Sequence, residues 1–382
     1  MFEVNCMKVF DLFCGTGGFS KGFENSEGAN FEVSFGIDLL RTSVATFRLN
    51  HPKAHAVTGD IRKISKKNVS EMTGVKKGEL DVLVGGPPCQ GFSSIRPFRS
   101  SEDEDPRNTL FEEYASYVNF FRPKYFVLEN VVGLATHKSG NTIEQMQECF
   151  HSLGYDTEWK ILNAAHYGVP QKRERLIMLG APRGTKLEFP SPKFYYSGST
   201  IGHKNKEKTI SAKSGDNLPL AITAMEAIGD LPPIGSGESS LVYTNDPMNE
   251  YQRARRKNST ILELHSATKH SPKMMEIIKH SGKNISCIPK ELITSGFSSC
   301  YSRLDRDEPA VTITVNFVHP ASNRCIHPIL NRALTPREGA RLQSFDDDFK
   351  FFGNRSEITK QIGNAVPPLL GKAIAEKIKD FL

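Results

Sequence analysis

Short apolar runs separated by amphipathic stretches dominate the first 180 residues of the chain. Runs typical of buried strands cover 8–13, 31–37, 81–84, 125–128, 159–162 and 176–179. Apolar residues recur at helical spacing at 110, 111, 114, 117, 118 and 121, and two further helical stretches cover 19–25 and 141–153. Short strands in alternation with helices predict an α/β domain built on a doubly wound sheet.

The pattern becomes irregular after Ala181. Pro, Gly, Ser and Lys are frequent there, and only 220–228 and 271–280 favour short helices. A polar, charged segment at 96–107 also lacks apolar periodicity, and we expect it to be a mobile surface loop. We therefore expect residues 184–328 to form a second, smaller and loop-rich domain.

Regular spacing returns near the C-terminus. Thr335-Pro336-Arg337-Glu338 combines a capping residue with a proline and predicts the start of a helix that ends near Gln343. A second amphipathic stretch, 366–382, begins with two prolines and is expected to pack against the first domain. Residues 1–183 and 329–382 are therefore assigned together to the first domain.

The composition is that of a water-soluble globular protein. Of the 382 residues, 38% are hydrophobic and 24% are charged. No apolar run approaches the ~20 residues that span a bilayer, and the N-terminus lacks a signal-peptide pattern. We expect a cytoplasmic protein without a membrane partner.

The net charge of +6 is concentrated in one segment, because 181–330 holds 19 Lys and Arg against 14 Asp and Glu. Such an excess, though modest, fits a polyanionic partner. The seven cysteines form no Cys-x-x-Cys pair, which disfavours a zinc ribbon or a disulfide scaffold. Cys325 and His327 are a lone pair of potential metal ligands, and we expect core or surface positions for both instead.

Cys89 lies in an unusual setting. The strand at 81–84 is followed by Gly85-Gly86-Pro87-Pro88, whose prolines prevent the strand from continuing. The cysteine is therefore expected on a stiff loop at the carboxyl end of a strand, where open α/β sheets bind their ligands. Its neighbours are Gly, Pro, Gln and Ser rather than apolar residues. From this loop alone, a reactive thiol and a buried structural cysteine both remain open.

A glycine-rich turn, Cys14-Gly15-Thr16-Gly17-Gly18, joins the first strand to the first helix. Strand, glycine turn and helix in this order are typical of nucleotide-binding sites, because the glycines let the backbone approach the ligand. Asp38 ends the second strand about 20 residues further on, where a carboxylate can accept hydrogen bonds from ribose hydroxyls. A third strand-like unit ends at Gly59-Asp60-Ile61. Glycine turns also join many strands and helices that bind nothing, so the turn alone is weak evidence.

Taken together, these motifs resemble the C5-cytosine methyltransferases of the bacterial DNA-modifying type. The matching stretches in the first half are DLFCGTGG at 11–18, GID at 36–38, GDI at 59–61 and GPPCQGFS at 86–93. They continue with ENV at 129–131, QKRER at 171–175, RALTPRE at 332–338, RLQ at 341–343 and QIGNAV at 361–366. All occur in the family's order, interrupted where the family has its target-recognition domain. The resemblance implies a doubly wound, Rossmann-like, S-adenosylmethionine-dependent methyltransferase sheet, with 184–328 as the target-recognition domain.

The resemblance also implies a covalent mechanism. C5 of cytosine is a poor nucleophile, but a thiolate that adds to C6 converts the ring to an enamine whose C5 can accept a methyl group. Cys89 is the implied thiolate, and Glu129 in its neutral form would donate a hydrogen bond to N3. Arg175, and less directly Arg173, would bind O2. Taken singly, Glu129 and the arginines fit a strand-end salt bridge and surface positions, but beside Cys89 and the other motifs they favour catalysis.

The implied methyl donor is S-adenosylmethionine, with S-adenosylhomocysteine as the product and no metal. Phe13 would stack near the adenine, while Asp38 and Asp60 would bind the ribose and the adenine amine. The other implied donor-binding residues are Gly15, Gly18, Leu39, Ile61, Pro88, Leu110 and Asn364. Phe13 and Leu110 could equally be core residues. Asp38 is one methylene shorter than the glutamate commoner in the family at this position, and we expect ribose binding to survive the difference.

Double-stranded DNA is the implied substrate, and its target base must be flipped out of the stack to be reached. Gln90 and Ser93 are the implied DNA contacts, and 96–107 is expected to close over the duplex. Sequence choice would fall to 184–328. The basic run at 253–257 offers phosphate contacts but is also typical of a solvated face. The enzyme would belong to a restriction–modification system, with a cognate restriction endonuclease as a candidate partner, or act as an orphan modification enzyme. We expect it to act as a monomer.

Three alternatives compete with this interpretation. An RNA-cytosine enzyme like the tRNA-methylating branch shares the chemistry, but that branch differs after its PPCQ and has a much shorter insert than the roughly 145 residues here. An inactive DNA-binding homologue would lack the nucleophile or the acid, whereas Cys89 and Glu129 are both present. A dehydrogenase interpretation of the glycine turn leaves Cys89 and Arg175 unexplained.

Overall fold

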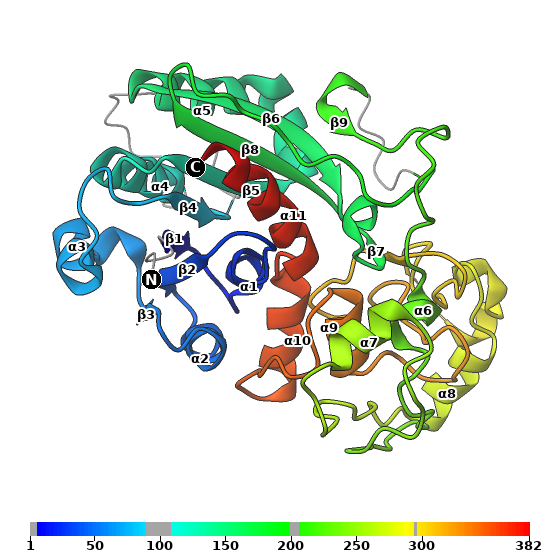
Figure 1. The fold of residues 1–382 in the computed structure, drawn as a ribbon. Helices are drawn as coiled ribbons and strands as arrows, with labels where there is room; N and C mark the ends of the chain where they lie inside the picture. The colour runs from blue at the N-terminus through cyan, green and yellow to red at the C-terminus, as the bar shows by residue number, and fades with distance from the viewer. Residues whose placement is uncertain (1–5, 89–107, 199–205, 294–295) are drawn as a thin grey trace, which may run out of the picture.

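The computed structural model describes residues 6–88, 108–198, 206–293 and 296–382 (Figure 1). Within these ranges, one eight-stranded sheet has the order β3-β2-β1-β4-β5-β8-β6-β9. Its strands are β1 (Met7–Leu12), β2 (Phe31–Asp38), β3 (His55–Thr58), β4 (Val82–Gly85), β5 (Tyr125–Val131), β6 (Tyr155–Asn163), β8 (Glu174–Pro182) and β9 (Thr209–Ile210). Strands β1 to β5 are parallel, whereas β8 runs antiparallel to both β5 and β6. The predicted doubly wound α/β sheet is confirmed.

The direction of winding changes between β1 and β4. Strands β2 and β3 lie on one side of β1, and β4 and β5 lie on the other. At such a switch point a crevice opens beyond the carboxyl ends of the strands. Asp38 ends β2, Gly85 ends β4, and Glu129 lies near the end of β5. The segments with candidate chemistry therefore meet at one edge of the sheet.

Helices cover both faces of the sheet, each over its own apolar core (Figure 1). One face is covered by α3 (Lys66–Thr73), α4 (Asn108–Phe121) and α5 (Asn141–Ser152), and the other by α1 (Gly18–Glu24), α2 (Arg41–Asn50) and α11 (Pro368–Ile378). Alternation along β4 divides its side chains, so Leu83 joins the first core while Val82 and Val84 join the second. Helix α11 packs against α1, which confirms the position predicted for the C-terminal stretch.

The remaining elements form a smaller lobe around a third apolar core (Figure 1). They are α6 (Ala224–Ile228), α7 (Glu250–Arg256), α8 (Pro272–Lys279), β10 (Ala310–Val311), α9 (Pro336–Leu342) and α10 (Arg355–Asn364). Buried Leu342 and Ile362 bring α9 and α10 into this core, although the sequence placed both helices with the first domain. The division at residues 184 and 328 stays a prediction.

Helix starts in the smaller lobe follow their capping residues. Helix α9 begins as predicted, with Thr335 and Glu338 forming a capping box before Pro336. Helix α6 is shorter than the predicted 220–228 because Thr223 caps it, and Leu220 instead forms an isolated bridge with Tyr195. No helix in the described part of the chain is long and apolar enough to cross a bilayer.

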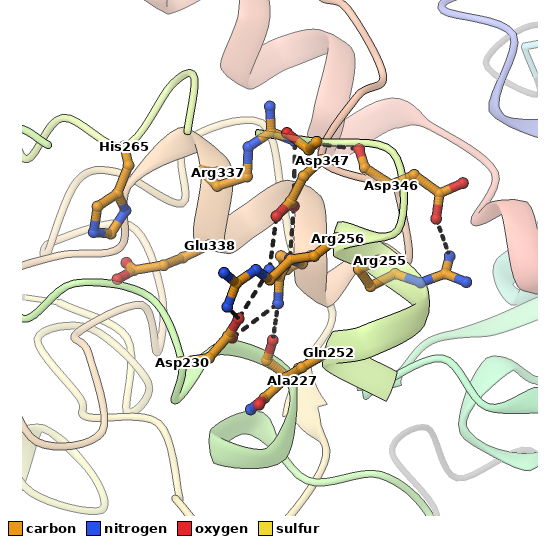
Figure 2. A network of polar contacts seen from close by, with 12 residues as sticks. Ala227, Asp230, Gln252, Arg255, Arg256, His265, Arg337, Glu338, Asp346 and Asp347 are labelled. Carbon is orange, nitrogen blue, oxygen red and sulfur yellow. Dashed lines mark hydrogen bonds and ion pairs between the residues drawn. The ribbon is translucent and has the colours of Figure 1, made fainter. Parts of the chain in front are cut away.

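Buried ion pairs join the elements of the smaller lobe. Arg341 is fully buried, and its Nε donates to Asp347 Oδ1 at 2.6 Å while its Nη1 donates to Asp230 Oδ1 at 3.0 Å. Arg256 Nη1 donates to the other oxygen of Asp230 at 3.2 Å. Arg337 lies 3.7 Å from Asp347 (Figure 2). The network links α7 and α9 to the loops on either side of them.

Figure 2 also shows what the basic run at 253–257 does in the fold. Arg255 pairs with Asp346 at 3.0 Å, and Arg256 reaches Asp230, so both guanidinium groups are largely buried in ion pairs. Arg253, the remaining arginine of the run, is exposed. Arg255 and Arg256 therefore do not belong to a solvated face, and their guanidinium groups are not free to bind phosphate.

Candidate active site

A cavity of about 1040 Å³ lies at the carboxyl edge of the parallel strands. All ten donor-binding residues named from the sequence line it: Phe13, Gly15, Gly18, Asp38, Leu39, Asp60, Ile61, Pro88, Leu110 and Asn364. Three of the four implied catalytic residues, Glu129, Arg173 and Arg175, line the same cavity. Cys89, Gln90 and Ser93 lie outside the described residues, as does the segment 96–107 expected to be mobile. The chain leads to Cys89 directly from Pro88 on the cavity wall.

The glycine turn forms one wall with an unusual backbone. Phe13 has a left-handed backbone with a φ of 60°, and Gly15 and Gly17 have φ values of 51° and 85°. Non-glycine residues in this region are strained and persist where the surrounding structure holds them. A side chain at Gly18 would collide with Val366, whose carbonyl oxygen lies 2.4 Å from an added Cβ. Gly18 therefore lets the turn pack closely against Val366, another residue of the cavity wall.

Two carboxyl groups, those of buried Asp11 and half-buried Asp38, line the cavity. Asp38 accepts hydrogen bonds from the backbone of Gly15 at 3.0 Å and Leu40 at 2.8 Å, and burial raises its pKa. Asp11 accepts a hydrogen bond from Ser20 at 2.6 Å, and burial raises its pKa to about 7. Neither carboxyl forms an ion pair with a described residue. Uncompensated buried carboxylates favour a ligand that brings positive charge into the cavity.

Asp60 is held differently, by an arginine two residues along the chain. Arg62 Nη2 approaches Asp60 Oδ2 at 2.6 Å and its Nε lies 2.8 Å from Oδ1, while the backbone N–H of Arg62 also donates to Oδ1. The hydrogen bonds from Arg62 lower the pKa of Asp60. The carboxylate is therefore ionised and fixed in orientation at the cavity rim. Arg62 also lines the cavity and was not named from the sequence.

Glu129 and Arg175 meet across strands β5 and β8. Arg175 Nε lies 2.8 Å from Glu129 Oε1, and each side chain is 13% exposed. Arg175 Nη1 also donates to the Glu174 carbonyl at 2.7 Å. The other Glu129 oxygen, Oε2, lies next to Gly86, where an added Cβ would be only 3.0 Å away. Glycine at 86 therefore lets the loop that leads to Cys89 pass close beside the Glu129 carboxyl group.

Asn130 connects the same strand to this loop. Its Nδ2 donates to the Pro87 carbonyl at 2.9 Å, and its Oδ1 accepts from the backbone N–H of Val131. The side chain is 5% exposed, so these bonds are shielded from water. The sequence motif contained Asn130 but indicated no role for it, because its partner lies 43 residues away.

Arg173 supports the cavity wall from behind. Its Nη2 donates to the carbonyl oxygens of Gly363 at 3.3 Å and Ala365 at 3.1 Å, and its Nη1 donates to Ile313 at 3.4 Å. Burial, followed by the charge of nearby Arg175, lowers its pKa. Both Nη groups are thus engaged with backbone from α10 and the smaller lobe. The less direct role expected for Arg173 stays a prediction.

The possible metal ligands Cys325 and His327 are both buried within the smaller lobe. Cys325 Sγ lies 3.0 Å from the His319 carbonyl oxygen, and His327 Nδ1 accepts from the backbone of Ile329 and Leu330. In the described ranges, no three His, Cys, Asp or Glu side chains lie close enough to hold a metal ion.

Comparisons with known proteins find relatives that match almost the whole chain. The chain is 34% identical to the Type II methyltransferase M.AgeI of Thalassovita gelatinovora, over 98% of this chain and 99% of the relative. It is 35% identical to the Type II methyltransferase M1.HphI of Haemophilus parahaemolyticus, over 99% of this chain and 88% of the relative. A prophage-encoded protein from E. coli, described as a DNA modification methyltransferase, shares the fold, with a TM-score of 0.73, 23% identity and coverage of 98% and 99% of the two chains.

The match to a family model extends over almost the whole chain. Residues 7–380 match the model of the C-5 cytosine-specific DNA methylase, which includes both the sheet lobe and the smaller lobe. The chain belongs to the C-5 cytosine-specific DNA methylase family.

Proposed function

We propose that this protein methylates C5 of a cytosine within one short sequence of duplex DNA. The observation that carries the proposal is the single cavity at the sheet edge. It is lined by the ten residues expected to hold the methyl donor and by Glu129 and Arg175, and the chain leaves its wall at Pro88 toward Cys89. Donor, acid and nucleophile are thus expected to act in one place.

Cys89 is the proposed nucleophile. Its thiolate adds to C6 of the cytosine, and the electron pair displaced from the C5–C6 bond is delocalised through N3 and O2. C5 of this activated ring would then accept a methyl group from the donor. Loss of the C5 proton and breakage of the bond between C6 and sulfur would restore the C5–C6 double bond and release methylated base and free enzyme. A base inside a duplex cannot make this contact, so the target cytosine is flipped into the cavity.

Glu129 and Arg175 are proposed to stabilise the negative charge that develops on the ring. Arg175 occupies Oε1 of Glu129. A proton on Oε2, the oxygen beside Gly86, can therefore be donated to N3 of the ring. The second Nη of Arg175 is then available to O2, while Nη1 is held by the Glu174 carbonyl. Groups fixed before the reaction need little reorganisation as charge develops, which is the main source of such catalysis.

The cavity suits S-adenosylmethionine, the donor that the methyltransferase family implies. Its volume accommodates a ligand of this size, and the carboxyl groups of Asp11 and Asp38 favour a ligand that carries positive charge. We propose that Asp38 holds the ribose, Asp60 the adenine amine and Phe13 the adenine face. S-adenosylmethionine, when bound there, supplies the methyl group that C5 of the activated ring accepts. No metal is proposed for this reaction.

The smaller lobe is proposed to choose the DNA sequence. Gln90 and Ser93, beside the nucleophile, are proposed DNA contacts. Because M.AgeI and M1.HphI are named Type II methyltransferases, we propose a restriction–modification role with an endonuclease that cleaves the same site. We propose that the enzyme acts as a monomer in the cytoplasm.

The proposal is tested by expressing the protein in a host that lacks cytosine methylation and mapping methylcytosine across the genome at base resolution. We expect one short motif to be methylated throughout, and the Cys89→Ala variant to leave it unmethylated. An unmethylated genome despite soluble protein would overturn the proposal. Incubation with tRNA would then separate an RNA-modifying enzyme from an inactive DNA-binding protein.

A further inference from the structure

The two lobes are joined by a two-stranded parallel sheet close to the active site. Strand β7 (Gln171–Lys172) pairs with β10 of the smaller lobe. Thr312 Oγ1 donates to the Lys172 carbonyl at 3.1 Å, and the backbone N–H of Ile313 donates to Gln171 Oε1 at 2.8 Å. Arg175 follows Lys172 by three residues. A movement of the smaller lobe therefore shifts the backbone that carries Arg175, the arginine proposed to act in catalysis.

The Lys172 side chain reinforces this joint. Its Nζ lies 3.1 Å from Glu308 Oε2 and 5.3 Å from the centroid of the Tyr196 ring. The side chain is only 15% exposed. Although burial by itself lowers the pKa of Lys172, hydrogen bonds to Tyr196 and Glu308 raise it overall. A charged ammonium group therefore connects three chain segments, and we call this contact the Lys172 clasp.

The clasp continues into the buried ion-pair network of the smaller lobe. The carbonyl oxygen of Glu308 accepts from the N–H of Ala224, the first residue of α6. At the other end of α6, the Ala227 carbonyl accepts from Arg341 Nη1 at 2.9 Å. Ala227 lies beside the arginine–aspartate pairs in Figure 2. When the smaller lobe moves, Glu308 therefore moves with it, and the ion pair with Glu308 shifts Lys172.

We propose that Lys172 is a positioning residue: its clasp with Glu308 and Tyr196 holds β7 against the smaller lobe, so that Arg175 faces Glu129 when the smaller lobe has bound its DNA target. Lys172 does not line the cavity assigned to the cytosine and the methyl donor. This inference rests on the proposed function, because it assigns Arg175 to the reacting ring.

The test compares Lys172→Met with Lys172→Arg and with a matched control. Lys208 also lies between a glutamate and an aromatic ring, 2.8 Å from Glu158 and 5.0 Å from the Trp159 centroid. It directly precedes β9, the edge strand of the eight-stranded sheet, whereas β7 belongs to the separate two-stranded sheet. The single-turnover rate of methyl transfer is measured on a duplex oligonucleotide that carries the mapped motif. Affinities for that duplex and for S-adenosylhomocysteine are measured by calorimetry, and stability by thermal unfolding.

We expect Lys172→Met to lower the single-turnover rate by roughly 10- to 100-fold, because small displacements of catalytic groups have effects of this size. Both affinities are expected to change by less than about twofold, because Lys172 is proposed to affect the chemical step, which single-turnover rates separate from binding. Lys172→Arg should restore most of the rate, because arginine can both pair with Glu308 and stack on Tyr196. Lys208→Met should leave the rate unchanged.

An unchanged rate in Lys172→Met overturns the inference, as does a loss of duplex affinity that accounts for the whole effect, which would make Lys172 a DNA contact. Where Lys172→Met does not fold, Glu308→Gln carries the same expectation, since the Glu308 side chain is 46% exposed and its change to Gln keeps its shape. Failure of the wild-type protein to methylate any duplex would instead reject the proposed function.

Discussion

The sheet lobe and the smaller lobe are stabilised by different interactions. In the sheet lobe, aromatic side chains from α4, α5 and β5 pack together, with ring centroids 4.3 Å apart for Phe126 and Phe150 and 6.1 Å apart for Tyr114 and Phe126. In the smaller lobe, the largest fully buried side chains include Arg332, Arg337 and Arg341. An apolar core can relax around a small change, whereas an ionic network that loses one partner retains a buried, uncompensated charge.

Arginine–carboxylate pairs are therefore proposed to serve two purposes in this protein. The Arg175–Glu129 pair lies at a cavity, and each side chain is 13% exposed, so a substrate can reach its remaining donors. The Arg341–Asp230 pair is fully buried, and Arg341 also donates hydrogen bonds to the Ala227 carbonyl and to Asp347. Both pairs consist of an arginine and a carboxylate. They differ in whether a ligand can reach their polar atoms, which are accessible in the proposed catalytic pair and buried in the structural pair.

Glu129→Gln should have the largest effect and should change chemistry alone. The amide keeps the shape of the side chain but cannot transfer a proton, so we expect the single-turnover rate of methyl transfer to fall by about 10²- to 10⁴-fold. The midpoint of unfolding in urea should stay nearly unchanged. A rate within threefold of wild type would show that Glu129 is not the acid.

Arg341→Met should show the reverse behaviour. Removal of this guanidinium leaves Asp230 and Asp347 buried with fewer partners, so we expect the free energy of unfolding to fall by about 3–5 kcal/mol. Urea titration followed by circular dichroism measures the change. Arg253→Met is the control, because this exposed arginine belongs to α7 but pairs only with Glu250 in the described structure, and its effect should stay within about 0.5 kcal/mol. Equal effects of the two variants would contradict the comparison.

Acid should affect the two lobes in opposite directions. Burial lowers the pKa of His327 to about 4, so the unfolded chain binds the proton first, and stability present above the ordinary pKa of 6.5 is lost as pH falls toward 4. Burial raises the pKa of Asp11 from 3.8 to about 7, so its ionised carboxyl destabilises the fold above pH 7, and this penalty is relieved progressively as pH falls from about 7 toward 3.8. The largest contribution is about 3 kcal/mol for His327 and about 4 kcal/mol for Asp11.

Amide hydrogen exchange at pH 7.5 and pH 5 measures the effect of acid on the stability of each lobe separately. Between these values, amides of α9 should lose protection relative to amides of β1. His327→Asn should reduce the loss in α9, and Asp11→Asn should reduce the change in β1. Parallel changes in both regions would show that the lobes unfold as one unit and would remove this distinction between them.

Much of the sheet lobe could be predicted because its signals are local. Apolar runs predicted the strands, and glycine and proline marked where each strand ends, which places Asp38 and Glu129 at one edge of the sheet. The roles of Asp11, Arg62 and Asn130 were not predicted, because no local pattern records what a polar side chain will contact. Asn130 and Pro87, for example, meet because β4 and β5 are neighbours in the sheet.

The sequence by itself predicted the fold class and, through the family resemblance, thirteen of the residues that line the cavity. The tertiary structure alone decided which charged residues are buried. Arg255 and Arg256 belong to a basic run that fits a solvated surface, yet their partners Asp346 and Asp230 lie far away in the sequence. Arg341 and Asp230 are likewise separated by 111 residues. Local periodicity reports on the face that an element buries, whereas an ion pair depends on which distant elements the completed fold brings together.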